Sequence, residues 1–186
     1  MRTLIRFLIL GLILIFHSYG IFSQHYFDND TLSKNEKRLI LMHPTVSNLK
    51  NFHSLINENI LSLPDVDIVG VYYDTAAYDY SRSVKYINSE SPENFYLHAI
   101  TCYIDHKLIY NENSCTKFFK KLFSNSDGIV FFGGPDIPPV FYREKTHVTT
   151  SVSDPERHCF ELSFLFHLLG GFQNEKVVPL LKENPN

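Results

Sequence analysis

One stretch, residues 126–171, constrains the fold of this chain more than any other. It opens with an apolar run over residues 128–132 that is bounded by turn residues, which is typical of a strand buried on both faces of a parallel sheet. The run ends at Gly133-Gly134-Pro135-Asp136, where two glycines allow backbone to approach a ligand closely and the proline fixes the exit. A helix is predicted to begin at Asp154-Pro155 and to end at Gly170-Gly171, since these residues suit the two ends of a helix. A strand that ends in a glycine-rich turn is where α/β proteins place ligands.

The rest of the sequence alternates between strand and helix patterns. Strands are predicted over residues 38–43, 66–73 and 95–104, and helices from Thr45 or Ser47 to about residue 62, over 81–88 and over 116–123. Short connections between alternating strands and helices predict a parallel sheet with helices on both faces. The fold class is therefore expected to be α/β.

Residues 1–23 are predicted to be a targeting segment. Arg2 and Arg6 precede an uninterrupted apolar run over residues 7–16, and small residues follow it, as in a signal peptide. We therefore expect export to the periplasm or the medium. An uncleaved membrane anchor is the alternative, although a span of about 20 residues would have to include Arg6 or His17.

The remaining domain boundaries follow from polarity. Residues 24–37 are polar and predict a flexible leader, so that the folded part covers residues 38–186.

The formal net charge of −3 provides no electrostatic basis for binding nucleic acid, and any membrane contact is expected only through residues 1–23. The histidines are scattered and no metal-binding motif is present, so neither a metal nor a cofactor is predicted.

The stretch from residue 126 to 171 resembles the class I glutamine amidotransferase-like superfamily, and most closely its gamma-glutamyl-gamma-aminobutyrate hydrolase branch. The resemblance rests on Asp127-Gly128, on Gly133-Gly134-Pro135-Asp136, on Pro139 and Tyr142, and on Asp154, Arg157 and Glu161 in the spacing D-x-x-R-x-x-x-E. His158 stands where the family often has aspartate. The resemblance implies a flavodoxin-like three-layer sandwich with a mostly parallel sheet, and a small gamma-glutamyl or glutamine-like substrate.

The resemblance also implies a cysteine nucleophile that forms a thioester with the substrate. In the family, a further strand delivers this cysteine in a G-x-C-x-G turn, and a histidine and an acidic residue come much later. None of these motifs lies within residues 1–186. The chain is therefore expected to be the N-terminal part of such a domain, incomplete at its C-terminus and inactive by itself.

The resemblance assigns roles to the residues that carry it. Gly133 and Gly134 become candidates for an oxyanion hole, for which a plain tight turn is the alternative. Pro135, Asp136 and Tyr142 are predicted to bind substrate from the rim of the pocket, and a solvated loop is the alternative. Asp154, Arg157 and Glu161 are interpreted as structural. Arg157 and Glu161 stand four residues apart in a helix and can form an ion pair, usually worth about 0.2–0.5 kcal/mol.

Three cysteines occur, and none stands in a G-x-C-x-G turn. Cys102 falls in a predicted strand and Cys159 in a mostly buried helix, so both are expected to pack. Cys115 precedes a predicted helix start, where a thiol pKa can be lowered, but no histidine is placed to act as its base. One disulfide is conceivable in an exported protein, and the spacing does not choose the pair.

Two functions remain open from the sequence. The first is a cysteine-dependent hydrolase of gamma-glutamyl amides or a glutamine amidotransferase-like protein, with the catalytic Cys and His beyond this chain. The second is a non-catalytic, exported α/β module that binds or interacts.

Overall fold

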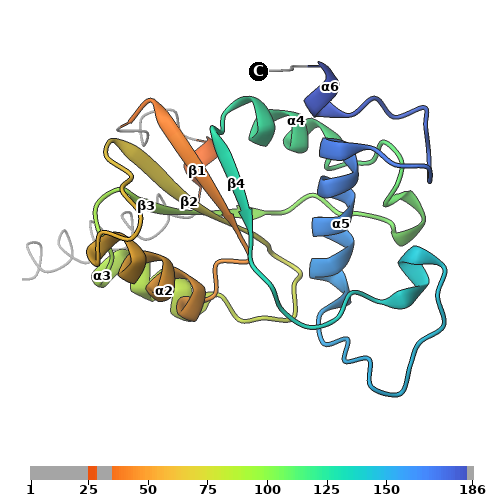
Figure 1. The fold of residues 1–186 in the computed structure, drawn as a ribbon, viewed down its shortest axis with the longest axis horizontal. Helices are drawn as coiled ribbons and strands as arrows, with labels where there is room; N and C mark the ends of the chain where they lie inside the picture. The colour runs from red at the N-terminus through yellow and green to blue at the C-terminus, as the bar shows by residue number, and fades with distance from the viewer. Residues whose placement is uncertain (1–24, 29–34, 184–186) are drawn as a thin grey trace, which may run out of the picture.

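The structure is a computed structural model that describes residues 25–28 and 35–183. Its centre is a sheet of four parallel strands in the order β3-β2-β1-β4 (Figure 1). The strands are β1 (Lys37–Met42), β2 (Val66–Tyr73), β3 (Phe95–Ile100) and β4 (Gly128–Phe131). The α/β fold expected from the sequence is confirmed, and it is consistent with a flavodoxin-like, class I glutamine amidotransferase-like fold.

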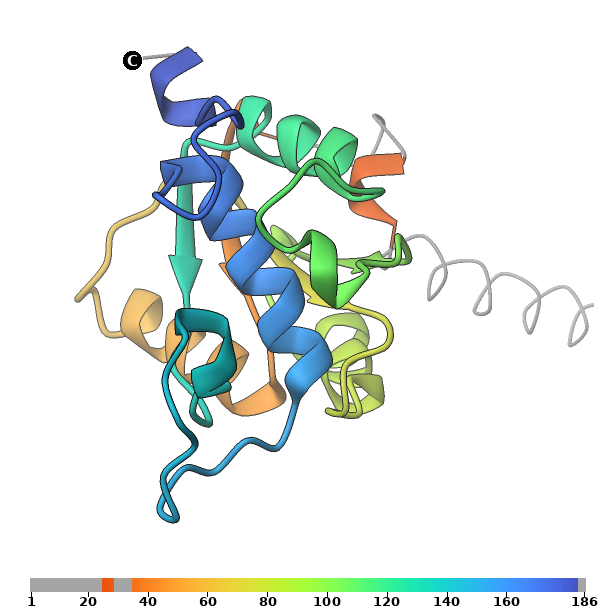
Figure 2. The same cartoon turned by 90° about the vertical axis from the view of Figure 1, so that its right-hand side faces the viewer.

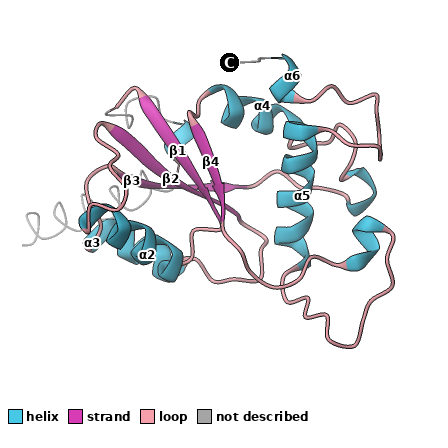
Figure 3. Cartoon of the chain, viewed as in Figure 1, coloured by secondary structure: helices cyan, strands magenta, loops and turns pink. Residues whose placement is uncertain are grey.

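Helices cover both faces of the sheet and complete three layers (Figures 1 and 3). On one face lie α2 (Val46–Asn57) and α3 (Ser81–Ser89), and on the other α4 (Thr116–Ser124) and α5 (Pro155–Leu169). The short α6 (Leu180–Glu183) follows, and 3-10 turns occur at Tyr26–Asp28, His106–Leu108 and Pro139–Tyr142. None of the helices formed by the described residues is long and apolar enough to cross a bilayer.

Side chains alternate between the two faces of each strand, and this divides the core. Leu41 of β1 points toward α2 and packs with Leu49 and Phe52 of that helix. Its neighbour Ile40 points the other way and packs in the cluster that contains Phe119 and Phe160. Burial of these side chains on both sides, at about 25 cal/mol per Å² of apolar surface, holds the layers together.

Local signals place the ends of the helices. The Asp154 carboxylate accepts a hydrogen bond from the Arg157 backbone N–H at 3.1 Å and caps the start of α5. Gly170 ends the helix with φ +73°, a left-handed conformation that suits glycine. Thr45 caps α2 in the same way, through the N–H of Asn48 at 3.1 Å. The two ends of α5 were predicted from the sequence, and Thr45 was one of the two predicted caps for α2.

The interpretation of residues 128–132 as a strand buried on both faces is wrong. β4 lies at the edge of the sheet and pairs with β1, while each of its residues is only partly buried. Within the described residues no strand pairs with its outer edge. A small apolar cavity of about 310 Å³ lies between β4 and α5, and its walls include Phe131 and Leu168.

The predicted flexible leader over residues 24–37 is also wrong where the structure describes it. Tyr26 and Phe27 are 3% and 5% exposed and belong to the hydrophobic core. The Phe27 N–H donates to Nδ1 of His98 at 3.3 Å, and the Tyr26 hydroxyl donates to Asp67 at 2.6 Å. Two aromatic side chains in a polar segment are enough to anchor it. The predicted targeting segment, residues 1–23, lies outside the described residues.

Candidate functional site

The candidate site lies at the edge of the sheet where β1 and β4 end side by side. Met42 is the register partner of Phe131, so the residues that follow these two strands leave the sheet together. They are His43 after β1 and Phe132, Gly133 and Gly134 after β4. The carboxyl ends of adjacent parallel strands form the crevice where open α/β sheets bind ligands.

The Gly133–Gly134 turn is exposed, and its two backbone N–H groups have no acceptor within the described part of the chain. The two glycines differ in their surroundings. A Cβ atom on Gly133 would meet no atom within 4 Å, whereas one on Gly134 would collide with the Arg157 guanidinium. A glycine at position 134 allows the backbone to lie close to the buried Arg157 guanidinium. The sequence alone did not reveal this contact.

Arg157 supports this turn from below. Its Nε and Nη2 atoms donate to the two carboxylate oxygens of Glu161 at 2.8 and 3.2 Å, in the bidentate geometry that favours arginine. Nη2 also donates to the carbonyl of Phe132, directly before the glycines, at 3.1 Å. The predicted ion pair is thus present, but it is buried rather than at the surface: the side chains are 5% and 13% exposed. Burial raises the pKa of Glu161, although the Arg157 hydrogen bond opposes this shift.

Further polar atoms are enclosed around the start of α5. Nη1 of Arg157, Oδ2 of Asp154 and Nε2 of His158 are buried, and none has a hydrogen-bond partner among residues 25–28 and 35–183. Burial and the Arg157 charge lower the pKa of His158, so its imidazole is neutral at pH 7. Such a concentration of enclosed polar atoms is unusual in a structural core and typical of a site.

A cavity of about 350 Å³ opens beside the Gly133–Gly134 turn. Its walls come from the ends of β1 and β2, from the loop after β4 and from the start of α5: His43, Thr45, Ala77, Tyr78, Pro135, Ser153, Asp154 and Arg157. The volume is at the lower end of the range for small-molecule sites, which is about 300–1,000 Å³. It suits a ligand of amino-acid size.

The structure separates the three residues predicted to bind substrate. Pro135 lines the cavity. Asp136 instead closes its own loop, because its carboxylate accepts from the Ser151 N–H at 2.9 Å and its N–H donates to the Ser151 carbonyl at 3.0 Å. Tyr142 borders a different cavity, of about 220 Å³, along α5. Neither Asp136 nor Tyr142 is therefore a wall of the cavity beside the glycine turn.

The sequence analysis missed His43. It directly follows the first strand, and its backbone has φ +57°, a left-handed conformation that is uncommon outside glycine. Its Nδ1 lies 2.6 Å from the Tyr80 hydroxyl, and burial, together with the Arg157 charge, lowers its pKa to about 4. A histidine at the carboxyl end of a strand was the available signal.

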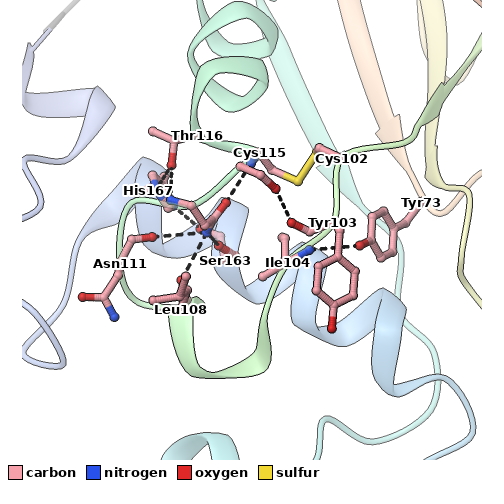
Figure 4. The surroundings of a disulfide bond; sticks show 12 residues. Tyr73, Cys102, Tyr103, Ile104, Leu108, Asn111, Cys115, Thr116, Ser163 and His167 are labelled. Atoms are coloured by element: carbon pink, nitrogen blue, oxygen red, sulfur yellow. Dashed lines mark hydrogen bonds between the residues drawn. A yellow bond between two sulfur atoms is a disulfide. The ribbon is translucent and has the colours of Figure 1, made fainter.

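The cysteines are not placed for nucleophilic chemistry. Cys102 and Cys115 form a disulfide (Figure 4), which removes Cys115 as a candidate nucleophile. Cys102 lies just beyond β3, because that strand ends at Ile100 rather than at residue 104. Cys159 is 1% exposed, and burial raises its pKa to about 12, so it carries no thiolate at pH 7.

The segment around the disulfide is held on α5. Asn113 donates from Nδ2 to the Ser163 hydroxyl at 2.9 Å. The Thr116 hydroxyl lies 3.0 Å from Nε2 of His167 (Figure 4). These contacts fix the connection between β3 and α4 against the same helix that carries Arg157 (Figure 2). The disulfide region is thus part of the scaffold and not of the cavity.

Comparison with known proteins adds one match. A family model described as Peptidase C26 matches residues 67–179, which include the Gly133–Gly134 turn and the whole of α5. No curated protein and no solved structure matches the chain.

Proposed function

Because the chain belongs to the Peptidase C26 family, a class I glutamine amidotransferase-like family, we propose that it forms part of the site of a cysteine-dependent hydrolase of gamma-glutamyl amides. The observation that carries the proposal is the Gly133–Gly134 turn. It presents two backbone N–H groups that have no acceptor among residues 25–28 and 35–183, and it lies against the buried Arg157.

These N–H groups are suited to stabilise negative charge. When a thiolate attacks the carbon of a carboxamide, a C–S bond forms and the carbonyl oxygen becomes an alkoxide. A backbone donor aimed at that oxygen typically lowers the barrier by about 3 kcal/mol. The Arg157 guanidinium, which is paired with Glu161, lies against Gly134 and fixes the position of the turn through the Phe132 carbonyl.

The rest of the reaction follows from the chemistry of thioesters. Collapse of the alkoxide breaks the C–N bond, and the amine leaves with a proton from a general acid. Water then adds to the thioester, which releases the glutamyl carboxylate and restores the thiol. Since Cys102, Cys115 and Cys159 are bonded or buried, we place the nucleophile and its histidine outside residues 1–186.

The test compares Gly134→Ala with Cys159→Ala in a form of the protein that includes a G-x-C-x-G cysteine, assayed with gamma-glutamyl-p-nitroanilide. The added methyl group displaces the turn from Arg157, so kcat should fall by about 100-fold, the cost of one oxyanion donor. Cys159→Ala only removes a packed thiol and should retain activity. Equal losses in both variants, or no loss at Gly134, would remove the oxyanion assignment.

The second function, a non-catalytic binding module, is favoured by one observation: none of the three cysteines can act as a nucleophile. Residues 1–186 alone should hydrolyse no gamma-glutamyl amide under either proposal. Stable folding, ligand binding and absence of turnover in every longer form would favour the binding module.

We also propose that the protein is exported and that residues 1–23 direct this. The support comes from the charged and apolar pattern of those residues and from the Cys102–Cys115 disulfide, a bond that persists mainly in oxidising compartments. N-terminal sequencing of the exported protein should find Ile21 or Gln24. Retention of Met1 with stable membrane association would indicate an anchor instead.

A further inference from the structure

His43 is a wall residue of the cavity beside the Gly133–Gly134 turn, and Nε2 is its second ring nitrogen. His43 lines the cavity and its Nδ1 is engaged with the Tyr80 hydroxyl at 2.6 Å. Nε2 has no hydrogen-bond partner among the described residues, yet it is not one of the polar atoms that the fold seals from solvent. This nitrogen is therefore open to a ligand.

The backbone holds His43 in this place at a cost. A left-handed conformation in a residue with a Cβ atom costs about 1–2 kcal/mol. Three hydrogen bonds maintain it here. The His43 N–H donates to the Val71 carbonyl at 3.2 Å, and the His43 carbonyl accepts from the Thr45 N–H at 2.8 Å and from Asn48 Nδ2 at 2.9 Å. Asn59, Asp65 and Arg143 have a similar positive φ away from the cavity, so at His43 this conformation fixes the position of the ring and does not by itself identify a site.

The Tyr80 contact selects one tautomer of the imidazole. Tyr80 is 6% exposed, and burial raises its pKa above that of a free tyrosine, so its hydroxyl keeps its proton. Among the described residues, Nδ1 of His43 is the one acceptor that this hydroxyl reaches. A buried hydroxyl proton without an acceptor would cost about 1–3 kcal/mol, so the hydroxyl donates to Nδ1. His43 then carries its own proton on Nε2.

A neutral imidazole with its proton on Nε2 recognises an oxygen acceptor. The lowered pKa of His43 keeps the ring neutral at pH 7, so it donates one directed hydrogen bond without a full charge. Thr45, Tyr78 and Ser153 line the same cavity. The hydroxyl oxygens of Thr45 and Tyr78 accept from the N–H groups of Asn48 and Val46 at 3.1 and 3.4 Å. Arg157 and Asp154 both line the cavity and Arg157 is paired with Glu161, so the directed N–H of His43, and not a net charge of the wall, selects an oxygen acceptor.

We propose that His43 is a specificity-determining residue that donates from Nε2 to the α-carboxylate of a gamma-glutamyl group seated in this cavity. The inference rests on the proposed function and extends it by identifying which end of the substrate occupies the cavity. In a gamma-glutamyl amide, a short aliphatic chain separates the α-carboxylate from the scissile carbonyl. His43 and the glycine turn end adjacent strands, so one small ligand can reach both.

The experiment uses the full chain and two probes that differ only in the carboxylate, L-glutamine and 4-aminobutanamide. Binding is measured from chemical shift changes in NMR titrations. The wild-type chain should bind L-glutamine at least about tenfold more tightly, since a hydrogen bond to a charged group contributes roughly 1.5–3 kcal/mol. His43→Phe should lose this preference and bind both probes alike.

His53→Phe is the matched control. His53 also pairs with a tyrosine, through Nδ1 and the Tyr86 hydroxyl at 2.7 Å, but it lies on α2 and does not line the cavity. This variant should keep the wild-type preference. Tyr80→Phe is a second test that leaves the imidazole in place while removing the donor to Nδ1. It should weaken L-glutamine binding and leave 4-aminobutanamide unaffected.

The tautomer has its own readout, independent of any activity. At pH 7 the nitrogen chemical shifts of His43 should show a proton on Nε2 and none on Nδ1. A proton on Nδ1, or equal affinity of the wild type for the two probes, would overturn the inference. In that case, cysteine-dependent turnover of gamma-glutamyl-p-nitroanilide by a longer form would show that the proposed function still holds. Failure to bind either probe would also overturn it, and absence of turnover would then reject both proposals.

Discussion

The ion pair beneath the glycine turn should dominate the stability of the candidate site. We predict that Glu161→Met lowers the free energy of unfolding by about 3–5 kcal/mol, because it leaves the Arg157 guanidinium buried without its counter-charge. Arg157→Met should cost a similar amount, since Glu161 would then be buried alone. Both side chains are nearly enclosed, at 5% and 13% exposure, so solvent cannot replace the lost partner.

The double variant provides the sharper expectation. With both charges gone, two methionines fill a similar volume, and such replacements of buried pairs are often close to neutral. The Phe132 carbonyl would still lose its Arg157 donor at 3.1 Å, which costs about 1–3 kcal/mol. The double variant should therefore lose less stability than either single variant. Urea unfolding followed by circular dichroism measures all three.

A matched control comes from an exposed pair. Lys50 and Glu90 lie 3.3 Å apart, and both side chains are 53% exposed. Glu90→Gln should therefore change stability by less than about 1 kcal/mol. If the effects of Arg157→Met and Glu161→Met simply add in the double variant, the two charges are not coupled and the account of the supported turn is wrong.

Three further outcomes are expected. Replacing Cys102 and Cys115 together by alanine should lower the free energy of unfolding by about 3 kcal/mol, because the disulfide closes a loop with a sequence separation of 13. Dithiothreitol should lower the urea midpoint of the wild type and leave that of the double alanine variant unchanged. Burial lowers the pKa of His98 to about 4, against 6.5 when unfolded, so between these values the unfolded state binds a proton that the native state does not. His98 should therefore contribute up to about 3 kcal/mol to the loss of stability as the pH drops from 7 to 4, in addition to the contribution of His43, and the loss should be smaller in His98→Phe. Iodoacetamide should modify Cys159 only after unfolding, because its thiol is buried and its pKa is about 12.

The sequence alone determined the order of the main elements and several of their ends, because these depend on short-range physics, although β3 and α2 end earlier than predicted. Asp154 and Pro155 predict the start of α5, and Gly170 its end, through capping and backbone preferences that act within a few residues. The apolar run over residues 66–73 predicts β2 at its observed bounds, since β-branched and aromatic side chains fit a buried strand. The alternation of such elements was enough to predict the parallel α/β sheet.

The candidate site was predicted only in part, because sequence patterns report on contacts within a few residues and not on contacts between distant segments. Gly133 and Gly134 were identified because glycines after a strand have local meaning. What Gly134 accommodates could not be identified, since the Arg157 guanidinium reaches it from a helix that begins more than twenty residues later. Asp136 was predicted to bind substrate, and the sequence did not predict that its carboxylate accepts a hydrogen bond from the Ser151 N–H.

Tertiary structure alone decided the contacts that join distant segments. It placed β4 at an edge, brought Tyr26 and Phe27 into the core, and paired Cys102 with Cys115. It also set His43 beside the glycine turn, through a strand register that joins residues 89 positions apart, such as Met42 and Phe131. Hydrophobic burial and sheet pairing select such neighbours over the whole chain at once, and no local pattern of residues records which neighbours they will be.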